Sequence, residues 1–423
     1  MNIKHSFKHR IVNFTSGEFV RNIGWLGLAE SINRIFRLSA TLILPRFLTE
    51  HDYGLAALVI TTYEFTNVFT RVGVGAKIIQ VENENLDEFC ETAYWLNWII
   101  FFLVFLFQCV AAFPIAWFFQ DDALILPVCV MSLIYLFSPL GRVQAALVMR
   151  EKRLKITAFK QASVSFTSNL ATVLLAIGGA GMWAIVLPRV ISAPLETLIY
   201  LYSHPWRRSR NFTLKHSKEI LSFGSNYLGI GFLKTLKENL DYLLVGRFLG
   251  VDALGMYFFA FNAGIGMSLS IIKSITTALY PQLCSVRENF SSLKATYYKS
   301  LKTISLIIIP FVFLQATLAP FYVPFIFGEK WIPAIPILII ICISAIPRPY
   351  EMASLQLLVS IGQPRVALIW NSLFTILFTL ILLIGVHWQA TGVAISVLVA
   401  NFLFIPPLVL WTNRYVFRKA PEY

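Results

Sequence analysis

Long apolar stretches, separated by short polar segments, run through the whole chain. Each stretch has about 20 residues or more, which is the length that an α-helix needs to cross the hydrocarbon core of a bilayer. The pattern predicts twelve spanning helices, near 22–46, 53–77, 93–118, 123–149, 156–177, 181–203, 219–246, 253–281, 299–323, 332–360, 366–386 and 390–412. We therefore expect an all-α polytopic membrane protein.

The longest polar interruption is the basic segment 204–218, SHPWRRSRNFTLKHS, near the middle of the chain. It separates the predicted helices into two sets of six. We therefore predict an N-terminal six-helix lobe over 1–203, a cytoplasmic basic linker over 204–218, and a C-terminal six-helix lobe over 219–423.

A short pattern occurs twice, 201 residues apart. The run RFL at 46–48 is followed by Gly54, and the run RFL at 247–249 is followed by Gly255. Duplicated apolar halves are typical of transporters that have two lobes and a path between them. Because each half holds six helices, the halves have the same orientation and are parallel repeats about an axis along the membrane normal.

Composition and the distribution of Lys and Arg predict how the chain is oriented in the membrane. Of the 423 residues, 57% are hydrophobic and 13% are charged, against roughly 25% charged in soluble domains. With a cytoplasmic N-terminus, the inner segments hold 22 Lys and Arg residues and the outer loops hold 3. The positive-inside rule then places both termini in the cytoplasm and accounts for the net charge of +13 without a nucleic-acid partner.

Charged residues also lie inside the predicted helices, ten of them basic and six acidic. A charge at a helix centre costs about 2.5–3.5 kcal/mol on insertion scales, so such residues usually face the protein interior or water. In helix 22–46, Glu30, Arg34 and Arg37 share one face because their spacings are i,i+4 and i,i+3.

The repeat partner of that helix, 219–246, carries a similar set. Lys234 and Glu238, and Lys237 and Asp241, are each four residues apart and lie on neighbouring positions of the helix surface. Pairs of this kind can neutralise each other, and residues near helix ends can extend to the headgroups.

Two further basic residues, Arg71 and Lys273, are 202 residues apart and match the repeat within one position. Structural pairing does not explain a positive surplus at repeat-related positions, so we predict a water-filled cavity that binds an anionic cargo, since guanidinium groups bind phosphate oxygens bidentately. The candidate cargo-binding residues are Arg34, Arg37, Arg71, Lys234, Lys237 and Lys273.

Three acids of the same helices, Glu30, Glu238 and Asp241, are candidates for coupling transport to H⁺ or Na⁺, although they can equally serve to balance charge. The five cysteines have no metal-ligand spacing. We expect no catalytic residues, no metal and no cofactor, and therefore no enzyme.

Several sequence runs resemble a known family in the right order. RFLTEHDYGLAALVITTYEF, VGVGAKIIQ and AYWLNW in the first half, and LSFGSNYLGIGFLKTLKENLDYLLVGRFLGVDALGMYFFAFN and FGEKWIPAIPILII in the second, are similar to bacterial polysaccharide exporters of the Wzx type. These exporters belong to the multidrug/oligosaccharidyl-lipid/polysaccharide (MOP) flippase superfamily. The resemblance covers nearly the whole chain and is strongest to the colanic and teichuronic acid exporters, many of which carry two further C-terminal helices.

The resemblance implies two six-helix lobes that form a V around a central cavity. It also implies a flippase of the bacterial cytoplasmic membrane that moves oligosaccharide repeat units on undecaprenyl diphosphate from the inner to the outer leaflet, by alternating access, for exopolysaccharide, capsule or O-antigen synthesis. Its expected partners are this lipid-linked anionic oligosaccharide, an H⁺ or Na⁺ counter-ion, membrane lipids and other polysaccharide-assembly proteins.

Two alternatives remain open at this point. A membrane-embedded polysaccharide polymerase, ligase or glycosyltransferase needs a sizeable outer loop, whereas the predicted outer loops have fewer than about twelve residues. A drug or metabolite exporter of the same superfamily often carries cations, which a cationic cavity repels.

Overall fold

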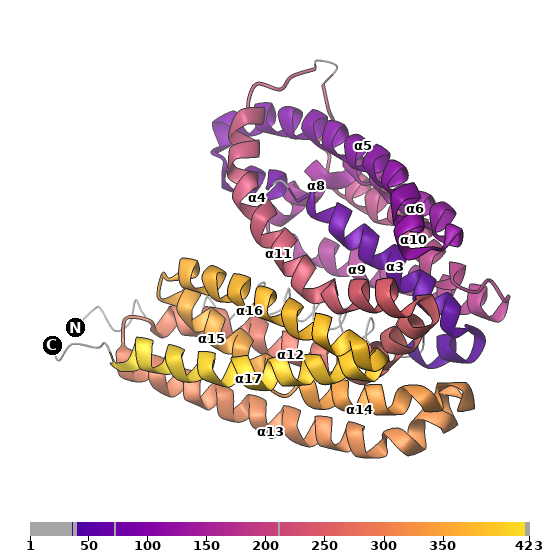
Figure 1. Cartoon of the computed structure of the whole chain (residues 1–423). Helices are drawn as coiled ribbons and strands as arrows, with labels where there is room; N and C mark the ends of the chain where they lie inside the picture. The colour runs from indigo at the N-terminus through magenta and orange to yellow at the C-terminus, as the bar shows by residue number, and fades with distance from the viewer. Residues whose placement is uncertain (1–35, 37–39, 72, 210–211, 419–423) are drawn as a thin grey trace. The chain divides into compact units, whose positions relative to one another are not determined.

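The computed structural model describes residue 36 and residues 40–71, 73–209 and 212–418. Every regular element in these residues is a helix, which confirms the all-α prediction for the part of the chain that the structure describes (Figure 1). Residues 40–47 are helical, but most of the predicted helix 22–46 lies outside the described residues.

The chain forms two compact units. The first contains Thr62–Gly231 and the described residues before Leu48, and the second contains Leu48–Thr61 and the described residues from Phe232 on. Helices α3 (Glu50–Val68) and α11 (Ser217–Leu249) contribute to both units. The linker 204–218 belongs to the first unit.

The remaining helices of the first unit are α4 (Val74–Gln80), α5 (Leu86–Phe119), α6 (Ile125–Ser132), α7 (Ile134–Phe137), α8 (Pro139–Arg150), α9 (Leu154–Ile177) and α10 (Trp183–Ser203). Those of the second unit are α12 (Val251–Val286), α13 (Phe290–Tyr322), α14 (Ile335–Ser344), α15 (Arg348–Ser360), α16 (Pro364–Gly385) and α17 (Gln389–Arg418). Short 3₁₀ or π turns connect several of them.

Five helical stretches in the described residues are long and apolar enough to cross a bilayer, namely Asn83–Phe119, Trp183–Ser203, Phe290–Phe327, Glu329–Ser360 and Pro364–Phe417. A sixth forms if Asp122–Phe137 and Pro139–Arg150, which are bent by 53° at Ser138, are taken as one span. Helices α3, α9 and α11 are long but less apolar, because polar and charged residues interrupt them. The chain is thus a multi-pass membrane protein, and the count of twelve spans remains a prediction.

Three helices that the sequence pattern predicts as continuous are broken in the structure. Segment 53–77 breaks after Val68 and resumes at Val74, because Gly73 adopts a left-handed conformation with φ 72°. Segment 123–149 bends at Ser138, just before Pro139. Segment 332–360 breaks between α14 and α15, where closely spaced prolines remove backbone N–H donors.

The core of the first unit forms where α5 packs on α4 and α8. The first turn of α5 holds Asp87 and Glu88, which suits the positive end of the helix dipole. From there the helix buries Phe89 and Ala93 in an apolar cluster that includes Val143 of α8. In a bilayer such side chains leave lipid and not water, so close van der Waals packing, more than the hydrophobic effect, stabilises the contact between these helices.

The core of the second unit includes the fully buried Trp331. Its ring stacks on Phe259 of α12 with centroids 4.0 Å apart, and it meets Tyr53 of α3 edge-to-face at 5.2 Å. Lys330 donates a hydrogen bond of 2.8 Å to the carbonyl of Leu48. The start of α3 is therefore an integral part of this unit.

Helices α3 and α12 cross at two glycines of the repeated sequence pattern. A Cβ atom on Gly54 would collide with the backbone of Val251, and one on Gly255 would collide with the backbone of Glu50. Gly255 lies 201 residues after Gly54, and Val251 lies 201 residues after Glu50, so the two contacts are equivalent under the repeat. The predicted repeat spacing therefore appears in the fold as a two-sided helix crossing that has no room for a larger residue.

Candidate functional site

The structure describes the side chains of half of the predicted cargo-binding residues, namely Arg71, Lys234 and Lys237. Arg34 and Arg37 lie outside the described residues, and so does the side chain of Lys273 in α12. Of the described candidates, Lys234 and Lys237 lie on α11, and Arg71 follows α3 in the first unit.

Arg71 lies in a turn and not in a helix. Helix α3 ends at Val68, whose carbonyl accepts a hydrogen bond of 3.0 Å from the backbone N–H of Arg71. The placement of Arg71 inside a continuous helix 53–77 is therefore wrong. Its side chain is exposed and its guanidinium can approach an anion from solvent.

Lys237 is held where α11, α15 and α16 meet in the second unit. Its Nζ donates to Oε1 of Glu351 at 2.6 Å and to Oδ1 of Asn371 at 3.3 Å. The same nitrogen lies 4.3 Å from the centroid of the Phe374 ring, a favourable cation–π position. We call Glu351, Asn371 and Phe374 the ammonium cage.

The ammonium cage is largely sheltered from solvent. The Lys237 side chain is 21% exposed and that of Glu351 is 9% exposed. The amide N–H of Asn371 donates to the carbonyl of Ala367 at 3.0 Å, which turns its oxygen toward Lys237. Removing one partner of such a pair leaves an uncompensated charge, which costs about 3–5 kcal/mol for a buried pair.

Lys234 lies one turn before Lys237 and is open to solvent. Its side chain is 68% exposed, and its Nζ is 4.0 Å from Oε1 of Glu238, which is 55% exposed. Such an exposed pair contributes roughly 0–1 kcal/mol, so little holds Lys234 in place. Of the two lysines, Lys234 is the one that an anionic ligand can reach directly.

The acids proposed for ion coupling differ in their surroundings. Glu30 lies outside the described residues. Asp241 is buried and accepts hydrogen bonds from the hydroxyl of Tyr257 at 2.8 Å and the backbone N–H of Tyr242 at 3.0 Å. The spacing had placed Asp241 beside Lys237, but Lys237 pairs with Glu351 instead.

The first unit contains a comparable lysine pair between α9 and α10. Lys160 donates to Oε1 of Glu196 at 3.1 Å and lies 5.6 Å from the centroid of the Tyr200 ring. The lysine is 20% exposed, but the glutamate is 46% exposed. This pair is a natural reference for the ammonium cage, because it has the same chemical groups with a more open carboxylate.

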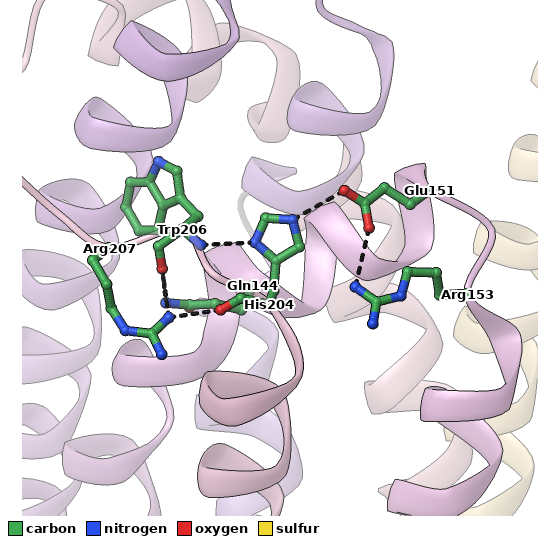
Figure 2. Close-up of polar contacts among 6 residues, drawn as sticks. All are labelled: Gln144, Glu151, Arg153, His204, Trp206 and Arg207. Atoms are coloured by element: carbon green, nitrogen blue, oxygen red, sulfur yellow. Dashed lines mark hydrogen bonds and ion pairs between the residues drawn. The ribbon is translucent and has the colours of Figure 1, made fainter.

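The linker 204–218 starts on a hydrogen-bond cluster, which Figure 2 shows between α8 and the end of α10. Nδ1 of His204 accepts from the backbone N–H of Trp206 at 3.1 Å, so Nε2 carries the proton and donates to Glu151 at 3.0 Å. This hydrogen bond from His204, together with one from Arg153, holds the pKa of Glu151 below the usual value for a glutamate.

The guanidinium of Arg207 closes the same cluster, with hydrogen bonds to the carbonyls of His204 at 2.6 Å and Trp206 at 2.8 Å (Figure 2). Gln144 of α8 also donates to the carbonyl of Trp206, at 3.3 Å. The linker is therefore fixed to the first unit at its start, and its charges are partly used for this attachment.

The sequence pattern misses the partners that surround Lys237. Glu351 and Asn371 lie 114 and 134 residues further along the chain, so no local spacing indicates the contact. It also misses the pair of His51 and Asp252, whose Nδ1 and Oδ1 atoms are 2.8 Å apart. Their separation of 201 residues is the repeat spacing, so a search for polar residues at repeat-equivalent positions would have found them.

Among the residues that the structure describes, no group of three or more His, Cys, Asp or Glu side chains could hold a metal ion.

Comparisons of the sequence agree on one family. The family model described as "Polysaccharide biosynthesis protein" matches residues 43–336. The teichuronic acid biosynthesis protein TuaB of Bacillus subtilis is 26% identical over 406 residues, which cover 93% of this chain and 82% of that protein. The lipopolysaccharide biosynthesis protein WzxC of Escherichia coli is 24% identical, with 90% of this chain and 77% of that protein covered.

Solved structures of the MOP superfamily share the fold. The lipid II flippase MurJ in an inward closed conformation has a TM-score of 0.77 at 14% identity, covering 93% of this chain and 87% of that one. An inward-facing multidrug transporter of the MATE family has a TM-score of 0.74 at 15% identity, covering 91% and 95%. The family model and these relatives confirm the resemblance to Wzx-type polysaccharide exporters, and the solved structures show a fold shared with MOP-superfamily transporters.

Proposed function

Because the chain belongs to the polysaccharide biosynthesis protein family, we propose that it is a flippase for lipid-linked oligosaccharides. Its cargo is an oligosaccharide repeat unit on undecaprenyl diphosphate, which it moves from the inner to the outer leaflet of the bacterial cytoplasmic membrane. The observation that carries this proposal is the family match, together with relatives named for teichuronic acid and lipopolysaccharide biosynthesis.

The charges of the described residues support an anionic cargo. Lys234 on α11 and Arg71 after α3 are both exposed, and Lys234 has a distant, exposed counter-charge. A diphosphate offers several oxygens, so it gains charge-assisted hydrogen bonds from such groups. In this proposal, Arg34, Arg37, Arg71, Lys234, Lys237 and Lys273 bind the diphosphate and the sugars.

We assign the movement to alternating access by two six-helix lobes that form a V, built from twelve helices with both termini in the cytoplasm. Parallel repeats of this kind are typical of transporters that rock about a central site. The two-sided crossing of α3 and α12 at Gly54 and Gly255 supports the repeat relation.

Coupling to H⁺ or Na⁺ would use Glu30, Glu238 or Asp241. Asp241 already has a tyrosine hydroxyl and a backbone N–H as partners, which favours a structural role for it. Glu238 is exposed beside Lys234 and is the better coupling candidate among the described acids. Export that persists after collapse of both ion gradients would contradict any coupling.

The test is complementation of a deletion strain. Arg34→Gln and Lys234→Gln together should abolish the surface polysaccharide while the protein remains in the membrane. Lys299→Gln, a change of one exposed lysine on α13, is the control and should leave the polymer at its normal level. Unchanged polymer in the double variant would overturn the assignment of the cargo-binding residues.

Two measurements separate the remaining alternatives: the side of the membrane on which lipid-linked repeat units accumulate, and drug susceptibility. A flippase mutant accumulates lipid-linked repeat units on the cytoplasmic side, whereas a mutant in a polymerase or ligase accumulates them after transfer. A drug exporter mutant would lose resistance and keep its polysaccharide.

A further inference from the structure

The three residues of the ammonium cage enclose the Nζ atom of Lys237. An ammonium group has three N–H donors; two of them donate to Glu351 and Asn371, and the ring of Phe374 lies 4.3 Å from the same nitrogen. The side chain is 21% exposed. A ligand that reaches Lys237 must therefore displace a partner, and Glu351 is the partner that carries the opposing charge.

The open Lys234 lies three residues before Lys237 on α11. Side chains at this spacing are neighbours on a helix surface, about 5–6 Å apart at their Cβ atoms. An anion that binds Lys234 thus comes within reach of Lys237. What prevents Lys237 from binding that anion is its contact of 2.6 Å with Glu351.

Glu351 lies on a helix segment with breaks at both ends. Helix α15 starts at Arg348, after the break that follows α14, and it is followed by Gly362, which has a φ of 78°. The segment of 13 residues packs on α12, α13, α16 and α17, where Ala353 and Leu357 are buried in an apolar cluster. Its hydrogen bond to Lys237 ties it to α11.

We infer that Glu351 is a positioning residue that controls whether Lys237 binds the cargo. In the structure described here, Glu351 holds Lys237. When the diphosphate binds at Lys234, one of its oxygens replaces the Glu351 carboxylate as the counter-charge of Lys237, and α15 is released from α11. This inference rests on the proposed function and adds to it a residue that links cargo binding to a helix movement.

The exchange keeps Lys237 paired but leaves the carboxylate of Glu351 without its counter-charge. Lys237 exchanges one anionic partner for another, and the freed carboxylate needs a cation or water. Arg348 precedes Glu351 by three residues on α15, a spacing at which their side chains are neighbours. Arg348 is half-buried, with its Cζ atom 5.7 Å from the Phe261 ring, and its charge already acts on the carboxylate of Asp241, so the freed Glu351 has to share this cation with Asp241.

The test measures binding of inorganic pyrophosphate to the purified full chain in nanodiscs by calorimetry. Glu351→Gln removes the competing charge but keeps a hydrogen-bonding group, and it should raise the affinity about tenfold, the change that 1.4 kcal/mol produces. Glu351→Asp should keep the wild-type affinity. The double variant Lys237→Gln with Glu351→Gln should lose the gain.

Glu196→Gln is the matched control, because it removes the carboxylate of the other lysine pair and changes the net charge by the same amount. It should leave pyrophosphate affinity unchanged. If Glu351→Gln does not fold, Asn371→Ala removes the weaker partner at 3.3 Å and should give a smaller gain.

The outcomes separate this inference from the proposed function. If Lys234→Gln lowers pyrophosphate affinity but Glu351→Gln leaves it unchanged or lowers it, the pair is only a structural bridge; the inference is then wrong and the proposed function stands. An equal gain in Glu196→Gln would also overturn the inference, because the effect would then be one of overall charge. If pyrophosphate does not bind to any variant or to the wild type, both proposals fail.

Discussion

Two lysines one turn apart on α11 show how surroundings decide the role of a charge. Lys234 is 68% exposed, with a glutamate 4.0 Å away on its own helix. Lys237 is 21% exposed, with a glutamate at 2.6 Å on another helix. The first lysine is available to a ligand, whereas the second joins three helices.

The comparison also shows what a spacing rule can and cannot detect. Both lysines have an acid four residues further along, but only Lys234 uses it. Asp241 is buried against Tyr257, so it is not available to Lys237. A local rule identifies neighbours on a helix surface, but the packing of other helices determines which neighbour forms the pair.

The largest expected effect is a difference in protein stability between variants of the two lysines. Lys237→Ala leaves Glu351 buried without its counter-charge and should lower the free energy of unfolding by about 3–5 kcal/mol. Lys234→Ala should change it by less than about 0.5 kcal/mol, as is usual for surface positions. Unfolding of the purified protein in detergent, followed by tryptophan fluorescence, measures both values.

A double replacement sharpens this result. Lys237→Met combined with Glu351→Leu removes both charges and should recover most of the stability, because apolar residues can replace a buried ion pair at little cost. Equal losses for Lys237→Ala and Lys234→Ala would show that burial does not distinguish the two lysines.

An effect of intermediate size is expected at three glycines, of which two lie against a neighbouring helix and one faces open space. Gly54→Ala and Gly255→Ala place a Cβ atom against the backbone of the crossing helix, so α3 and α12 must separate. Such overpacking costs about 1–3 kcal/mol. Gly229→Ala on α11 is the control, since no atom lies within 4 Å of its added Cβ.

The control should gain about 0.5–1 kcal/mol, because alanine is the better helix residue. The same unfolding assay gives all three values. A loss in Gly229→Ala, or none in Gly54→Ala, would contradict the close crossing.

The sequence was a good guide to what depends on hydrophobic length and repeat spacing. The helical class, the positions of most helices and the family could be predicted from runs of apolar residues and motif order. The breaks near Ser138 and Pro347 lie beside Pro139, Pro347 and Pro349, and a proline inside an apolar stretch is a sequence signal for a kink. The break at Gly73 could not be predicted, because a hydropathy pattern continues across it. Of the candidate site, the exposed Lys234 was predicted, while the ammonium cage depends on contacts more than 100 residues apart along the chain.

The smallest expected effect concerns the linker, where the carboxylate of Glu151 is partly open to solvent while His204 is buried. The pKa of Glu151 is lowered by its hydrogen bond from His204. A lowered carboxyl pKa contributes stability that is present above the ordinary value, about 4.3, and is lost as the pH falls through the folded-state value. Since Glu151 is 44% exposed, this contribution is small.

We therefore expect the start of the linker to detach from α8 below pH 4.3, while the helices of the first unit stay folded. Hydrogen exchange of the amides in 204–209 should become faster below this pH and stay slow at pH 7, after correction for the intrinsic rate. In Glu151→Gln the additional acid-dependent exchange should disappear, because the group that titrates is gone. If this variant and the wild type show the same pH dependence, another group controls the linker, and the hydrogen bond between Glu151 and His204 contributes nothing that can be measured.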